Sequence, residues 1–62
     1  MIRKGDSVNI VNKDHVGYGQ KNLTITGITK HRHKNINLYE VQNDNSRFYC
    51  QQEDLEKVIT HG

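Results

Sequence analysis

The stretch that most constrains the fold is residues 38–59, where two alternating apolar runs flank a polar tetrad. Tyr39 and Val41 alternate with polar neighbours, and an aromatic-rich run at residues 47–51 follows the tetrad at residues 43–46 (NDNS). A period of two is typical of a half-buried strand. Because Asn, Asp and Ser side chains satisfy backbone groups locally, we expect a β-hairpin with a four-residue connection.

The end of this stretch changes character. Residues 52–55 (QEDL) are too short and polar for a strand. We interpret them as one helical turn that directs Leu55 into the core. Val58 and Ile59 then predict a last short strand.

The first half of the chain supplies the partners for this hairpin. Val8 and Ile10 share one face of a first strand at residues 7–11, and a long polar loop follows at residues 12–22. A second strand is expected at residues 23–28. Gly27 interrupts its alternation, which indicates a bulge or bend. A third strand is expected at residues 36–42.

The chain contains no proline and no alanine, and no segment of about ten residues has helical periodicity. Five short strands separated by turns favour an all-β fold, a partly open small barrel with a short helical turn before the last strand. We expect one domain over residues 1–62, with an ordered core of about residues 3–59. The core is predicted to contain Val8, Ile10, Ile25, Ile28, Tyr39, Val41, Phe48, Cys50, Leu55 and Val58.

Size and hydropathy limit what the chain can be. A domain of 62 residues buries only about 60% of the surface exposed by its unfolded chain, so the core is small. The sequence has no apolar run long enough to span a bilayer and no secretory signal, so we expect no membrane association. Cys50 is the single cysteine, which predicts a cytoplasmic protein with Cys50 as a buried core residue.

Charge is distributed unevenly along the chain. Residues 1–34 carry seven Lys or Arg against two Asp, and residues 35–62 carry two against five Asp or Glu. The densest basic run is residues 30–34 (KHRHK), and its cations can neutralise phosphates without sequence preference. Tyr18 lies between two glycines in a flexible loop and can stack on an unpaired base. The predicted nucleic-acid contacts are Lys30, Arg32, Lys34, Lys21, Tyr18 and Arg47. The alternative for the basic run is a solvated hairpin loop.

Other chemistry has weaker support. His31 and His33 would need further ligands, such as His15 or His61, to hold zinc, and the flanking cations oppose a metal there. The carboxylates of residues 53, 54 and 56 are expected to be solvated, with Asp54 capping the helical turn. No catalytic triad or phosphate-binding glycine motif is present, so we expect no enzyme activity, no metal and no cofactor.

Several short motifs together resemble the SH3-like small-barrel superfamily, particularly its KOW-like and other short bacterial or bacteriophage modules. The resemblance covers residues 3–59. It rests on residues 4–10 (KGDSVNI), 23–28 (LTITGI), 39–41 (YEV) with Phe48, and 54–58 (DLEKV). It implies a five-stranded barrel with a helical turn before the final strand. The chain departs from the KOW pattern at residues 17 and 19, where the glycines lie inside a longer loop.

These observations lead to a functional hypothesis. We expect a small non-enzymatic binding module that binds nucleic acid weakly, with tolerance of sequence, through a basic loop face. The alternative is a protein–protein interaction module that uses Tyr18 and Tyr49, for example a phage or prophage accessory protein that binds a host protein. Salt separates the two hypotheses, because phosphate contacts weaken as salt is added.

Overall fold

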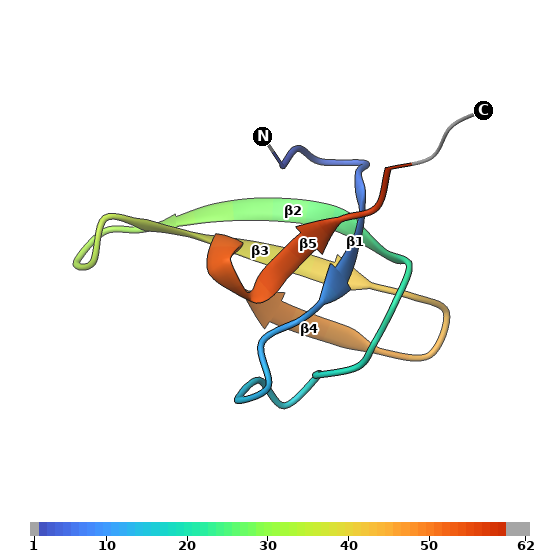
Figure 1. Ribbon diagram of the computed structural model, residues 1–62. Coiled ribbons are helices and arrows are strands. Elements are labelled where there is room, and N and C mark those ends of the chain that lie inside the picture. Colours follow the sequence, from blue (N-terminus) through green and yellow to red (C-terminus); the bar gives the residue numbers. More distant parts are fainter. Residues whose placement is uncertain (1, 60–62) are drawn as a thin grey trace.

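The computed structural model describes residues 2–59, which form five strands and one short helical turn (Figure 1). The elements are β1 (Ser7–Ile10), β2 (Leu23–His31), β3 (Ile36–Gln42), β4 (Arg47–Cys50), the 3-10 turn η1 (Gln52–Asp54) and β5 (Leu55–Lys57). No helix within these residues is long and apolar enough to cross a membrane.

All five strands belong to one antiparallel sheet in the order β4-β3-β2-β1-β5. The sheet curls but does not close, so β4 and β5 are its edges (Figure 1). The all-β class, the five strands, the partly open barrel and the helical turn before the last strand are therefore confirmed.

The β2–β3 hairpin is the longest feature of the sheet and projects beyond its neighbours (Figure 1). Its register shifts between Ile25 and Gly27, which confirms the expected bulge. Beyond the bulge, β2 continues to His31, three residues further than predicted. The extension has a physical cause: each residue from Ile28 to His31 pairs with β3. The basic residues 30–34 thus lie at the end of a paired ribbon.

The buried core lies on one face of the curled sheet. It contains Val8, Ile10, Leu23, Ile25, Tyr39, Val41, Cys50 and Leu55. Leu23 was not predicted, although it is fully buried. Ile28 was predicted in the core but is 44% exposed. It lies beyond the Gly27 bulge and beyond the part of β2 that pairs with β1, so the core covers it only in part. Phe48 is half-buried and packs against the core.

The last strand differs from the prediction. β5 begins at Leu55, directly after η1, and pairs with β1 so that Leu55 lies opposite Ile10. The strand ends at Lys57, opposite Val8. Val58 and Ile59 therefore follow β5 and do not form it, and Val58 is only partly buried. Pairing with β1 sets this register, and in this register Leu55 is buried in the core.

The four-residue connection between β3 and β4 confirms the predicted hairpin. The Asn43 side-chain Oδ1 accepts hydrogen bonds from the backbone N–H groups of Asn45 (2.8 Å) and Ser46 (2.7 Å). The Asn43 N–H donates to the Ser46 carbonyl at 2.9 Å. An asparagine that satisfies backbone donors locally is the reason that this tetrad turns.

Candidate nucleic-acid interface

The tip of the β2–β3 hairpin, residues 30–35, holds the basic run. β2 ends at His31 and β3 begins at Ile36, so four residues form the connection. The Asn35 N–H donates to the His31 carbonyl at 3.0 Å and closes the turn. Asn35 has φ of 51°, a left-handed conformation that asparagine tolerates better than most residues. This hydrogen bond and the left-handed conformation of Asn35 thus determine the conformation of the turn.

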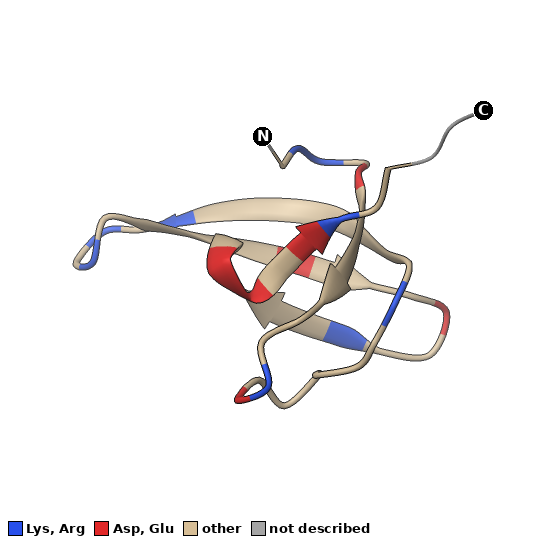
Figure 2. Cartoon of the chain, viewed as in Figure 1, with Lys and Arg blue, Asp and Glu red and all other residues tan. Residues whose placement is uncertain are grey.

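Three cations project from this tip without acidic partners. Lys30, Arg32 and Lys34 are exposed, and no Asp or Glu occurs from residue 23 to residue 39. Within residues 2–59 the one ion pair joins Lys57 to Asp6, 3.4 Å apart, outside the hairpin. Figure 2 shows the tip as a basic end, whereas acidic residues gather on η1 and β5. The tip therefore offers positive charge that the protein itself does not neutralise.

The two histidines of the tip lie edge to face. The ring centroids of His31 and His33 are 6.0 Å apart with an interplanar angle of 64°. The Nδ1 atom of His31 is shielded from solvent and has no hydrogen-bond partner. Within residues 2–59, no third ligand gathers beside this pair, and His61 lies outside the described residues. The His31–His33 pair therefore lacks the ligand number that zinc requires.

Tyr18 and Lys21 belong to a different surface. With Val11 and Glu56 they line a shallow hollow of about 290 Å³ beside the end of β1. The loop that carries them runs along the body of the barrel, away from the hairpin tip (Figure 1). The structure thus separates these two predicted contacts from the three cations of the tip.

The loop of residues 12–22 is bonded to the barrel, which corrects the expectation of a flexible loop. Backbone hydrogen bonds join Ile10 N–H to the Gln20 carbonyl (3.0 Å) and Gly19 N–H to the Ile10 carbonyl (3.3 Å). Gly17 is buried against Ile10 and Phe48. These contacts hold Tyr18 in place at the surface, where it is 53% exposed.

His15, Cys50 and Asp54 form a cluster under this loop that was not foreseen from the sequence. Their ligand atoms lie within 4.8 Å of one another, and the Cys50 Sγ is 3.4 Å from the His15 Nε2. Asp54 is 8% exposed, and its carboxylate accepts hydrogen bonds from the Asn12 side chain (2.6 Å) and the Gln51 backbone N–H (2.8 Å). The expected capping role of Asp54 is confirmed, but its expected solvation is wrong.

The tautomer of His15 decides what this cluster can do. The Gly17 N–H donates to Nδ1 at 2.9 Å, so Nδ1 is unprotonated and the ring proton resides on Nε2. The Nε2 then donates to the Tyr49 carbonyl at 2.9 Å on the edge strand β4. A protonated Nε2 neither takes a proton from the Cys50 thiol nor ligates a metal.

The Cys50 thiol is likewise unsuited to catalysis. Burial, together with the nearby Asp54 carboxylate, raises the pKa of Cys50 to about 11. Catalytic cysteines have lowered pKa values and are accessible, whereas Cys50 is 1% exposed. We interpret the cluster as a hydrogen-bond network that attaches the loop and covers part of the β4 edge. The expectation that Cys50 is a buried core residue is confirmed.

The six predicted contact residues therefore lie on separate parts of the surface. Lys30, Arg32 and Lys34 share the hairpin tip, and Tyr18 and Lys21 share the hollow beside β1. Arg47 begins β4, where its Nε donates to the Gln42 side chain at 3.3 Å. The carboxamides of Asn35, Asn37 and Gln52 were not among the predicted contacts, because uncharged Asn and Gln side chains are common at protein surfaces.

Comparisons with protein-family models, with curated proteins and with solved structures found no match to this chain.

Proposed function

We propose that this protein is a non-enzymatic module that binds nucleic acid through the tip of the β2–β3 hairpin. The observation that carries the proposal is the charge of the tip, where Lys30, Arg32 and Lys34 are exposed without carboxylate partners. Such cations displace the counterions condensed on phosphates, which favours binding without reading sequence. The narrow two-stranded ribbon allows phosphates to approach from several sides.

We also propose that the fold is an SH3-like small barrel and that the protein is located in the cytoplasm. The resemblance is supported by the open five-stranded sheet and by η1 directly before β5. A cytoplasmic location is supported by the unpaired thiol of Cys50, which a reducing compartment preserves.

The charge of the tip sets the expected salt dependence. Three neutralised phosphates on a single strand give a slope of log K against log salt of roughly −2, from about −0.7 per phosphate. Binding should therefore be detectable at low salt and weak at physiological salt.

The test is a fluorescence-anisotropy titration of labelled single-stranded DNA, duplex DNA and RNA at low and at physiological salt. The test variant replaces the three tip cations, Lys30, Arg32 and Lys34, with glutamine. Its control removes the same charge elsewhere, by glutamine at Lys13, Lys21 and Arg47. Both variants reduce net charge equally, so a difference between them reports position and not overall charge.

We expect the tip variant to lose binding and to flatten the salt slope by about 2, and the control to keep most of both. Equal losses in the two variants would show that net charge alone drives binding. Absence of binding to all three nucleic acids at low salt would refute the function.

Protein binding is the second candidate, and one specific observation favours it. Val16 is 91% exposed and Tyr18 53% exposed on a loop that hydrogen bonds attach to the barrel, and Tyr18 lines the hollow together with Val11. An ordered apolar surface of this kind suits a protein partner. Here the Tyr18→Ala variant should abolish capture of the partner, and the interaction should survive added salt.

A further inference from the structure

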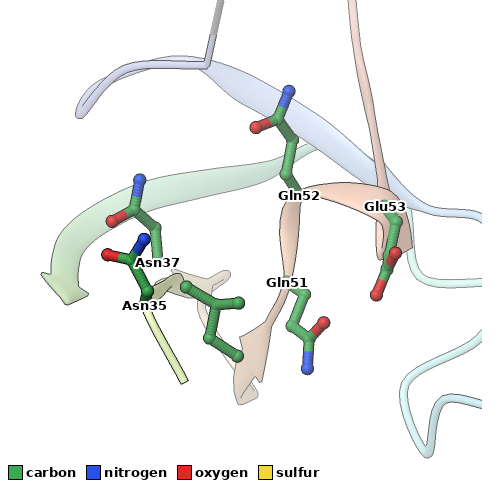
Figure 3. Close-up of a pocket in the computed structure, with 6 residues that line it drawn as sticks. Asn35, Asn37, Gln51, Gln52 and Glu53 are labelled. Carbon is green, nitrogen blue, oxygen red and sulfur yellow. The ribbon is translucent and has the colours of Figure 1, made fainter. Parts of the chain in front are cut away.

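A polar groove opens beside the tip of the same hairpin, between the start of β3 and η1 (Figure 3). Its volume is about 610 Å³. The lining residues are Asn35, Ile36, Asn37, Gln51, Gln52 and Glu53. The Asn35 and Asn37 side chains lie together on one side, and the residues of η1 lie across from them (Figure 3). The charge of the hairpin loop and the alternation of β3 do not by themselves require carboxamides at these positions.

Three of these carboxamides are exposed and available for hydrogen bonding. Asn35, Asn37 and Gln52 make no side-chain hydrogen bond within residues 2–59. Carboxamides elsewhere do take part in the fold, such as Asn12, which donates to Asp54, and Asn43, which closes its turn. Each free carboxamide offers two donor hydrogens and one acceptor oxygen. The groove therefore presents donors and acceptors to a ligand.

The cations of the tip stand next to this groove. Asn35 follows Lys34 directly in the chain, and Asn37 pairs with Lys30 across the hairpin. A ligand in the groove thus has an anion-binding site beside it. A nucleotide matches this arrangement, because its base edge carries hydrogen-bonding groups and its phosphate carries the charge.

We propose that the groove between β3 and η1 receives an unpaired base of a single-stranded nucleic acid while the hairpin tip holds the adjacent phosphates. This inference rests on the nucleic-acid function proposed above. The Ile36 side chain supplies an apolar contact for the base. A base in a duplex has its Watson–Crick edge occupied by its partner, so the groove selects single strands.

Glu53 gives the groove a preference among bases. A carboxylate only accepts hydrogen bonds, and the amino groups of cytosine, adenine and guanine are suitable donors. Uracil has no exocyclic amino group, and its one donor on this edge, the N3–H, lies between two carbonyl oxygens, which a carboxylate repels. The carboxamides can both donate and accept hydrogen bonds, so they fit either kind of base edge. The preference among bases is therefore set by Glu53. The groove therefore prefers bases with an amino group over uracil.

The first experiment compares affinities for single-stranded oligomers of cytidine, adenosine and uridine of equal length, and for a duplex. The variants are Asn37→Ala with Gln52→Ala, and Glu53→Gln. Asn45→Ala, in the β3–β4 turn away from the groove, is the matched carboxamide control. A thermal unfolding curve for each variant establishes that it folds. The second experiment titrates uncharged cytidine and uridine while NMR follows the side-chain amide signals of the groove.

We expect the wild type to bind the cytidine and adenosine oligomers several-fold more tightly than the uridine oligomer and the duplex. Glu53→Gln should remove this preference and tighten binding overall, because a negative charge is lost. Asn37→Ala with Gln52→Ala should weaken single-strand binding to the level of the duplex, with an unchanged salt slope. Cytidine should shift the groove amide signals more than uridine does.

These experiments distinguish failure of the groove inference from failure of the proposed nucleic-acid function. If oligomers bind with the tip-dependent salt slope but show no base preference, and the groove variants behave like Asn45→Ala, the groove inference is wrong and the nucleic-acid function stands. If neither the oligomers nor the duplex bind at low salt, both proposals fail together.

Discussion

Replacing Gly17 with alanine tests whether the loop of residues 12–22 is bonded to the barrel as the structure describes. Gly17 is buried, and a Cβ added there would lie 2.8 Å from the Ile10 Cδ1 and 2.9 Å from the Phe48 Cδ1. Both neighbours are ring or branch atoms packed on the core, so one of them must move. The His15 ring also lies edge-on against Phe48, with 6.2 Å between centroids.

Two terms of opposite sign set the magnitude. Overpacking of this kind costs about 1–3 kcal/mol. Alanine also restricts the unfolded chain, which favours the folded state by about 0.4–1 kcal/mol. The net expectation is a loss of about 1–2 kcal/mol in the free energy of unfolding. For a domain of this size that corresponds to a fall in Tm of about 4–15 °C.

The assay is urea and thermal unfolding followed by circular dichroism. Gly27→Ala is the matched control, because its added Cβ would meet only the Glu40 Cβ at 3.7 Å, an ordinary contact. That variant should be neutral or slightly stabilised. The reasoning is refuted if Gly17→Ala is as stable as the wild type or as the Gly27 variant, since the loop would then not press on Ile10 and Phe48.

Two further predictions concern the buried side chains of Asp54 and Cys50. Asp54→Ala should destabilise the fold by about 2–4 kcal/mol in urea unfolding, because two hydrogen-bond donors lose their acceptor, whereas the exposed Glu56→Ala should change stability by less than about 0.5 kcal/mol. Folding raises the pKa of Cys50 from 9.0 to about 11, so the unfolded chain loses this proton at lower pH than the folded protein does. The free energy of unfolding should therefore not depend on the ionisation of Cys50 below about pH 9, and should fall by about 2–3 kcal/mol as the pH rises to about 11. The difference between the wild type and Cys50→Ala isolates this effect, and a constant difference across that range would contradict it.

Much of the fold was predictable because strand alternation and turn chemistry are local. The alternation at Tyr39 and Val41 predicted β3 with its exact bounds, and Asn43 predicted the tight connection to β4. The phase break at Gly27 predicted the bulge. These signals depend on neighbours within a few residues, so the chain shows them without knowledge of its partners.

The predictions from sequence were wrong where pairing or packing with residues far away in the chain determines the structure. β2 continues to His31 because β3 pairs with it, although basic residues alone do not indicate a strand. Leu55 begins β5 because its place opposite Ile10 buries it, so Val58 falls beyond the last pair. Ile28 has an apolar side chain, but it lies beyond the part of β2 that pairs with β1, and 44% of it stays exposed.

The candidate site divides in the same way. The sequence by itself determined the charge of the tip, because a run of cations without a nearby carboxylate is visible in the chain. Only the tertiary structure placed Asn37 and Gln52 on opposite walls of one groove, set Tyr18 and Lys21 apart from the tip, and gave His15 the hydrogen bonds that fix its tautomer. Composition and short-range order belong to the sequence, whereas the meeting of residues far apart in the chain depends on how the sheet curls and pairs.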